Sequence, residues 1–274
     1  MIMPELPEVE TVKNYLSEKI LNKKIINTKV LNAKLRWPIN SKGIRAIKGQ
    51  TIQKVTRRGK YILLQFNDSI LTMVIHLGMT GIVSFKEVGN YEKQKHDHLL
   101  LYFDKFLLIY NDVRKFGSIH ITKKLSNMFL LKNLGPEPTS ASFNIEYLIN
   151  IAGKRKCSVK ELIMNQNIVV GIGNIYATEA LFLSKIHPST FANEVTKSQY
   201  KKLIKNIQLV LSRAISMGGS TIKDFVNAEG KPGYFSQELL VYQKKYCPIH
   251  KKNLISNIKI SGRSSFFCNK CQTL

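Results

Sequence analysis

The sequence predicts an α+β protein of two domains, with a β-rich N-terminal half, a helical half and a short cysteine-bearing tail. Eight short runs rich in β-branched and aromatic residues occupy residues 24–122. Gly, Asn or Asp separates them, as in antiparallel sandwiches and barrels. Beyond a proline-rich boundary at residues 135–140, the apolar spacing becomes helical. Three of the four cysteines fall within residues 247–271.

The first element is an amphipathic helix over about residues 8–20, in which Val9, Val12 and Leu16 share one face. The strand-like runs follow at residues 24–31, 51–56, 61–66, 71–76, 82–85, 98–103, 106–110 and 118–122. Helices are expected at residues 145–151, 159–165, 174–184 and 197–217. Residues 258–267 alternate like a hairpin with Gly262-Arg263 at its tip.

The residues ahead of the first helix include Pro4 and Glu5. Proline followed by acids is a common helix start. If translation begins at Met3 and that methionine is removed, Pro4 instead carries a free secondary amine, partly unprotonated because α-amino pKa values lie at about 7.7–8.0. Such an amine can form an iminium with a sugar aldehyde carbon, and Glu5 can transfer the protons.

The charge balance points to a polyanionic partner, nucleic acid first. The sequence carries 42 basic and 18 acidic residues, a net charge of +24. Part of this charge can also reflect the richness in Lys, Asn and Ile that AT-rich coding produces. No run of about 18 apolar residues and no secretory signal is found, so we expect a cytoplasmic location and no membrane partner.

The tail reads Cys247-x2-His250, then 17 residues, then Cys268-x2-Cys271. Two such turns can complete a tetrahedron of three thiolates and one imidazole around a single structural Zn²⁺. Four protein ligands leave no open position, which argues against a catalytic zinc. The alternative is a set of unpaired thiols in a loose tail.

Three further signals are weak by themselves. Arg263 at a hairpin tip suits phosphate binding, although a solvated arginine fits equally well. Gly171–Asn174 offers backbone N–H groups at a helix start but lacks the third glycine of a dinucleotide fingerprint. Lys60 opens a strand, where it can meet a phosphate, transfer a proton or simply be exposed.

In this order, these segments resemble the bacterial formamidopyrimidine-DNA glycosylase family over essentially the whole chain. Besides the cysteine tail, the matching segments are PELPEVE at 4–10, LRWP at 35–38, RGKY at 58–61, HLGMTG at 76–81, KHDH at 95–98, RKFG at 114–117, LGPEP at 134–138, GIGNIYA at 171–177, DF at 224–225 and GKPGYF at 230–235.

The resemblance implies a bifunctional DNA glycosylase and abasic-site lyase of base excision repair. Its substrate is double-stranded DNA with oxidised purines, chiefly 8-oxoguanine and formamidopyrimidines, or abasic sites, and it acts as a monomer. The implied domains are a catalytic β-sandwich over residues 1–135, a linker over 136–142, a helical DNA-binding domain with a helix–two-turns–helix element over 143–236, and a zinc-finger hairpin over 237–274.

The resemblance also implies roles for individual residues. Pro4 is the Schiff-base nucleophile, Glu5 the acid/base, Lys60 the β-elimination residue and Arg263 the residue linked to δ-elimination. The residues that fill the gap left by the flipped base are Met79, Arg114 and Phe116. The DNA-backbone contacts are His96, Arg155 and Asn174. The loop that closes over the everted base is residues 220–234, including Ser220, Thr221 and Tyr234.

Two departures from the family pattern matter. Met1 and Ile2 precede the usual start, and methionine removal requires a small following residue, so we expect Met3 to be the working start. His250 stands where the family usually has cysteine, and we expect zinc to be retained because histidine is a competent ligand.

Two other functions remain open. Endonuclease VIII is a relative with the same Pro-Glu chemistry on oxidised pyrimidines, although Leu6 and the Met79, Arg114 and Phe116 set favour the purine enzyme. The other is a zinc-finger DNA-binding protein without catalytic activity. This function fits if Pro4 never becomes the N-terminal residue.

Overall fold

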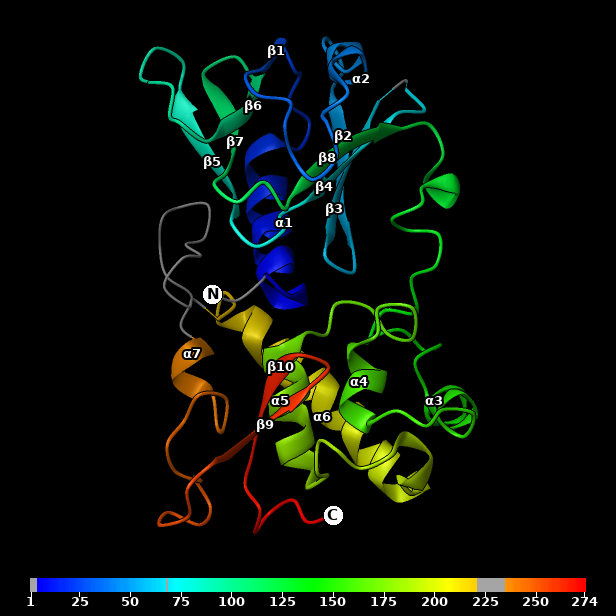
Figure 1. Cartoon of the computed structure of the whole chain (residues 1–274). Helices are drawn as coiled ribbons and strands as arrows, with labels where there is room; N and C mark the ends of the chain where they lie inside the picture. Colours follow the sequence, from blue (N-terminus) through cyan, green and yellow to red (C-terminus); the bar gives the residue numbers. More distant parts are fainter. Residues whose placement is uncertain (1–3, 68, 221–234) are drawn as a thin grey trace. The chain divides into compact units, whose positions relative to one another are not determined.

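The structure is a computed structural model that describes residues 4–67, 69–220 and 235–274 (Figure 1). These residues form two compact units. The first unit contains the described residues up to Lys132 together with residues 218–220, and the second contains Asn133–Met217 and Phe235–Leu274. Within the described part of the chain, no helix has the length and apolar character needed to cross a bilayer.

In the first unit, helix α1 (Leu6–Ile20) begins two residues before the predicted start. Pro7 lies in the first turn, where its missing N–H costs nothing. Glu5 is the N-cap, and its backbone N–H donates to the Glu8 carboxylate at 2.9 Å. Glu5 and Glu8 form a capping box, a local signal that favours this earlier start.

Two antiparallel four-stranded sheets enclose the core of the first unit, which confirms the predicted sandwich rather than a closed barrel. The first sheet has the order β1 (Asn27–Val30), β6 (Asp97–Tyr102), β7 (Phe106–Asp112), β5 (Gly81–Glu87). The second has the order β2 (Ile52–Arg58), β3 (Tyr61–Phe66), β4 (Thr72–His76), β8 (Ser118–Thr122). Buried side chains of α1 and of both sheets form one apolar cluster, which includes Leu16, Leu64 and Leu101.

Several local features of this unit differ from the prediction, and α2 and β7 differ most clearly. Helix α2 (Ser41–Ala46), capped by the Asn40 side chain, is too short to show a helical period in the sequence. Strand β7 extends past the predicted end at residue 110, because the polar residues Asn111 and Asp112 continue to pair with Ile82 and Gly81. A 3₁₀ turn, η1 (Leu125–Asn127), follows β8.

The second unit is helical, as predicted. Its helices are α3 (Ile145–Ala152), α4 (Val159–Met164), α5 (Asn174–Ser184), α6 (Lys197–Ser216) and α7 (Phe235–Glu238), with a 3₁₀ turn η2 (Ala192–Glu194). Ser158 and Thr196 cap α4 and α6 through capping boxes. Residues 165–173 join α4 to α5 as the expected pair of helices linked by turns.

The tail of this unit packs onto α5. Buried Glu179 accepts the backbone N–H groups of Leu240, Val241 and Tyr242 at 2.8–3.0 Å. The hairpin consists of β9 (Ser256–Ile260) and β10 (Arg263–Phe267). Ser261 and Gly262 form its two-residue turn with φ of 48° and 75°, as a type I′ turn requires. The turn therefore lies one residue earlier than the predicted Gly262-Arg263 tip, and Arg263 opens β10 beside it.

Candidate functional site

The start of α1 carries the two residues expected to perform the chemistry. Pro4 and Glu5 are buried, and Glu5 is 2% exposed. Glu8, one turn later, is also buried. One of its oxygens accepts from the Glu5 N–H, and the other accepts from the backbone N–H and hydroxyl of Ser220 at 2.8 and 2.9 Å. Ser220, a predicted lesion-loop residue, is thus joined through Glu8 to the turn that holds Glu5.

Lys60 lies in the tight turn between β2 and β3, next to Gly59, whose φ is +56°. Arg57 connects this turn to α1, because its guanidinium donates to the Gly59 carbonyl at 2.8 Å and to Glu10 of α1 at 2.5 Å. Burial alone would raise the pKa of Glu10, but hydrogen bonds from Lys13 and Arg57 hold it below its usual value. An ion pair between partly buried groups therefore sets the place of the Lys60 turn relative to α1.

The predicted gap-filling residues occupy two adjacent loops of the first unit. Met79 lies in the turn between β4 and β5, and Arg114 and Phe116 lie between β7 and β8. The Arg114 guanidinium lies 4.8 Å from the Phe116 ring centre, and Phe116 is 44% exposed. The exposed phenyl ring is suited to replace a lost base stack, and the guanidinium is suited to hydrogen-bond an orphaned base.

His96 precedes β6 in the first unit. Its carbonyl accepts the backbone N–H of Asp112 at 3.0 Å. The following residue, Asp97, is buried and accepts hydrogen bonds from Tyr91 and Asn111 at 2.8 and 2.9 Å. This arrangement fixes the backbone around His96 and leaves its imidazole partly exposed.

In the second unit, Asn174 opens α5 and contacts the hairpin strand β10. Its amide donates to the Ser264 carbonyl at 3.0 Å, while its oxygen accepts from Lys160 Nζ at 2.7 Å. Lys160 is 1% exposed and also donates to the Ser264 carbonyl and the Ser265 hydroxyl, at 3.2 and 2.6 Å. These bonds anchor the strand that presents Arg263, which is exposed, as is Arg155 after α3.

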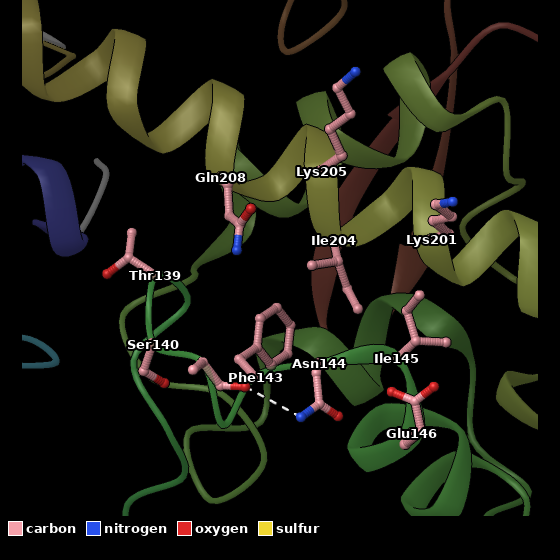
Figure 2. Close-up of a pocket in the computed structure, with 11 residues that line it drawn as sticks. Thr139, Ser140, Phe143, Asn144, Ile145, Glu146, Lys201, Ile204, Lys205 and Gln208 are labelled. Atoms are coloured by element: carbon pink, nitrogen blue, oxygen red, sulfur yellow. Dashed lines mark hydrogen bonds between the residues drawn. The ribbon is translucent and has the colours of Figure 1, made fainter.

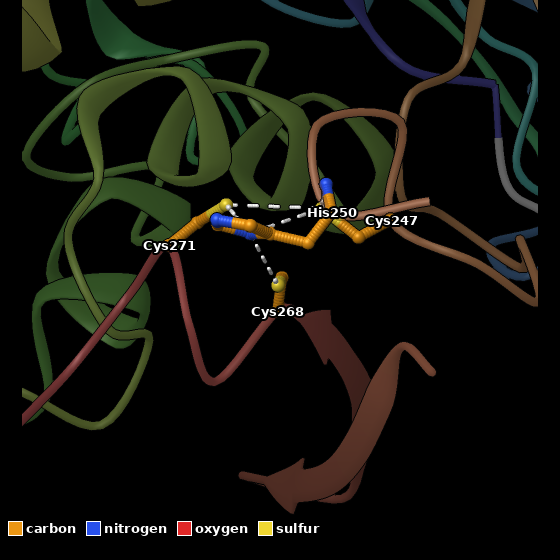
Figure 3. A group of neighbouring side chains, drawn as sticks. All are labelled: Cys247, His250, Cys268 and Cys271. Carbon is orange, nitrogen blue, oxygen red and sulfur yellow. Dashed lines mark hydrogen bonds between the residues drawn. The ribbon is translucent and has the colours of Figure 1, made fainter. Parts of the chain in front are cut away.

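Cys247, His250, Cys268 and Cys271 converge at the base of the hairpin (Figure 3), with all four ligand atoms within 4.8 Å of one another. The Cys247 and Cys271 sulfurs are 3.7 Å apart, close to the roughly 3.8 Å expected for two thiolates about 2.3 Å from one tetrahedral Zn²⁺. The His250 Nδ1 lies 3.3 Å from the Cys271 sulfur. The donor set can therefore hold a metal ion.

Comparison with known proteins shows the family of this chain. Residues 3–119 match the formamidopyrimidine-DNA glycosylase N-terminal domain, and residues 134–226 match the helix–two-turns–helix domain of the same proteins. A formamidopyrimidine-DNA glycosylase from Rickettsia felis is 42% identical over 98% of both chains. The chain belongs to the formamidopyrimidine-DNA glycosylase family.

Solved structures of this family share the fold. A Lactococcus lactis family member bound to abasic-site DNA has a TM-score of 0.90 and 35% identity, covering 98% of this chain and 100% of that one. The wild-type Lactococcus lactis protein bound to DNA with an oxidised pyrimidine has a TM-score of 0.90 and 35% identity, covering 99% and 100%.

Two predicted loop residues and one surface hollow are not part of the site described above. Thr221 and Tyr234, predicted for the lesion loop, lie outside the described residues. A separate hollow in the second unit lies between the start of α3 and α6, with Phe143, Ile204 and Lys205 in its lining (Figure 2). None of the predicted site residues that the structure describes lines this hollow.

Three residues with central contacts were not predicted from the sequence: Glu8, His76 and Lys160. The capping-box spacing of Glu5 and Glu8 was the only local signal for Glu8. His76, at the end of β4, stacks near Tyr61 with ring centres 4.8 Å apart, and its Nδ1 accepts the Gly78 N–H at 3.2 Å. No local sequence pattern distinguishes Lys160 from an ordinary lysine on a helix.

His76 makes the stability of this protein sensitive to acid. Burial lowers the pKa of His76 to about 4, and the charges of Lys60 and Arg36 act in the same direction. Between pH 6.5 and about 4 the unfolded chain therefore binds a proton that the folded chain does not. We expect about 1–3 kcal/mol of unfolding free energy to be lost as the pH falls through this window.

Urea unfolding at a series of pH values measures this loss. The His76→Asn variant keeps an acceptor for the Gly78 N–H but cannot titrate, so its stability should fall less steeply between pH 6.5 and 4. Equal slopes for the variant and the original chain would show that His76 is not the group responsible.

Proposed function

We propose that this protein is a bifunctional DNA glycosylase and abasic-site lyase that removes oxidised purines, 8-oxoguanine and formamidopyrimidines, from double-stranded DNA. The observation that carries the proposal is the start of α1, where Pro4 precedes Glu5 and the buried carboxylate of Glu8 accepts the Glu5 backbone N–H. Family membership and the net charge of +24 support a DNA substrate.

The proposed reaction begins once the damaged nucleotide has left the base stack. In a chain that begins at Pro4, the proline nitrogen attacks the sugar C1′, and the bond to the base breaks as the base leaves. The Pro4 amine gives up its proton, the sugar ring opens, and an iminium forms between the nitrogen and C1′. Glu5 supplies and removes protons at the sugar.

The same covalent link explains the proposed strand cleavage. An iminium at C1′ makes the C2′ proton acidic, so its removal expels the 3′ phosphate by β-elimination. A second elimination then expels the 5′ phosphate. We assign Lys60 to the first step and Arg263, whose guanidinium suits a phosphate, to the second.

The remaining site residues bind the DNA in this proposal. Met79 and Phe116 replace the lost stacking, and Arg114 hydrogen-bonds the orphaned cytosine. His96, Arg155 and Asn174 contact the backbone. Ser220 begins the loop, continuing through Thr221 to Tyr234, that closes over the everted base.

We assign the metal to one structural zinc held by Cys247, His250, Cys268 and Cys271. Three sulfurs and one imidazole are a donor set that zinc prefers, and the backbone N–H of His250 points to the Cys247 sulfur at 3.3 Å. When bound, zinc would hold together the base of the hairpin that carries Arg263.

Cleavage assays on matched duplexes test the proposed substrate class. We expect 8-oxoguanine opposite cytosine to be excised at least about tenfold faster than thymine glycol, because the proposal assigns Arg114 to the cytosine that a flipped purine leaves unpaired. The reverse order would assign the chain to oxidised pyrimidines, a possibility raised by the relative bound to such DNA. Tight binding without any cleavage would instead identify a DNA-binding protein without catalytic activity.

A further inference from the structure

A buried carboxylate lies between the two loops that carry the gap-filling residues. Asp112, at the end of β7, is 0% exposed. Its Oδ1 accepts the Thr80 hydroxyl at 2.6 Å, and its Oδ2 accepts the Gly117 N–H at 2.8 Å. Thr80 follows Met79 in one loop, and Gly117 ends the other loop, so a single side chain holds both.

Thr80 extends this connection to Arg114. Its hydroxyl oxygen accepts the backbone N–H of Arg114 at 3.0 Å while its hydrogen is donated to Asp112. A hydroxyl that donates to a carboxylate is polarised, so its oxygen accepts the next hydrogen bond more strongly. The Arg114 backbone is therefore linked through Thr80 to the same carboxylate that holds Gly117.

The two loops also touch backbone to backbone. Gly78 has φ of +63°, and a Cβ there would lie 2.4 Å from the Gly117 nitrogen. A Cβ on Gly117 would lie 1.7 Å from the Tyr110 hydroxyl. A side chain at Gly78 would force the two loops apart, and a side chain at Gly117 would push its loop away from Tyr110 and Asp112. The absence of Cβ atoms therefore permits the Asp112 contacts.

The sheet itself does not need this carboxylate. Backbone pairing of Gly81 with Asp112 holds β5 to β7, and apolar residues fill the core below. Burying a charged group is costly unless hydrogen bonds compensate it. The donors that compensate Asp112 come from the two loops, Thr80 from one and Gly117 from the other.

We infer that Asp112 is a positioning residue, acting through Thr80 and Gly117, that holds Met79, Arg114 and Phe116 in one fixed arrangement before DNA binds. The inference rests on the proposed function, since it assumes that these three side chains enter the gap left by an everted base. Groups held in place in advance lose less freedom on binding, so the ready-made arrangement favours eversion.

The test compares Thr80→Val with Asp112→Asn in a chain that begins at Pro4. Thr80→Val keeps the shape but removes the hydroxyl between Asp112 and Arg114, and Asp112→Asn removes the charge. Thr122→Val is the matched control, because its hydroxyl binds the Lys124 carbonyl on an exposed loop. Two substrates are used: an 8-oxoguanine:cytosine duplex and a single-stranded abasic oligonucleotide, which has no orphaned base.

We expect both variants to excise 8-oxoguanine from the duplex about tenfold more slowly, the effect of one lost buried hydrogen bond. They should also discriminate less between cytosine and adenine opposite the lesion. Borohydride trapping on the single-stranded abasic oligonucleotide should stay at the level of Thr122→Val, because it needs only Pro4 and Glu5.

Other outcomes overturn the inference. Unchanged duplex excision and discrimination in both variants would show that Asp112 positions nothing. An equal loss on both substrates, together with a lower melting temperature, would reduce Asp112 to a general stabilising role. If the unaltered chain neither forms the borohydride adduct nor excises the base, the proposed function itself fails. If the unaltered chain is active and both variants match it, only the inference about Asp112 fails.

Discussion

A chain that keeps any residue ahead of Pro4 will form no borohydride-stable adduct with 8-oxoguanine or abasic DNA. The nitrogen of an internal proline is a tertiary amide without a nucleophilic lone pair, whereas a terminal proline is a secondary amine that is partly unprotonated at neutral pH. The difference should exceed about a thousandfold, because covalent catalysis is abolished rather than slowed.

The experiment compares protein that begins at Pro4 with protein that retains Met1 to Met3. Trapping is followed by mass mapping of the cross-linked peptide. Both forms should bind a duplex containing a reduced abasic analogue with similar affinity, since the residues proposed to contact DNA are unaltered. An adduct of equal yield in the longer form, or one mapped to Lys60, would refute Pro4 as the nucleophile.

Replacing Cys268 by serine is expected to remove the metal and most of the strand cleavage. Cys268 is fully buried, and its sulfur accepts the Asn253 amide at 3.2 Å. Structural zinc contributes about 10–16 kcal/mol in zinc-finger peptides, far more than the few apolar contacts of this tail can replace. Without it the hairpin should lose its fold, and cleavage of an abasic duplex should fall at least about a hundredfold.

Metal content by mass spectrometry and strand cleavage should be measured on the same samples. Cys157→Ser is the matched control, because Cys157 lies outside the cluster and is half-buried. His250→Ala should also lose metal. Full zinc content in Cys268→Ser or His250→Ala would remove that residue from the ligand set.

Local patterns in the sequence are enough to predict much of the fold. β3, β8 and α5 have the predicted bounds because apolar spacing and turn residues mark both ends. The predicted start of α1 is two residues late, because the residues from Pro4 to Pro7 resemble a rigid lead-in, whereas Pro7 lies in the first helical turn and Glu5 caps it. The polar end of β7 could not be predicted, since its pairing depends on β5.

The candidate site also contains residues that the sequence predicts and residues that it does not. Sequence alone indicates Pro4, Glu5 and the four candidate metal ligands, because their chemistry or spacing is unusual. Glu8 and Lys160 gain their importance from partners that are distant in sequence. Ser220 lies 212 residues from Glu8, and Ser265 lies 105 residues from Lys160. No local pattern records such contacts.

The tail has a consequence for how the second unit is made. Glu179 and Lys160, both buried in the helical part, receive hydrogen-bond partners from Leu240, Val241, Tyr242, Ser264 and Ser265. A chain that ends before residue 240 therefore lacks these partners for both the Glu179 carboxylate and the Lys160 ammonium, whereas a chain that ends just before the hairpin lacks them for Lys160. Residues 240–265 thus complete the hydrogen bonding of helices that precede them in the chain, so a premature stop ahead of these residues damages the helical half as well.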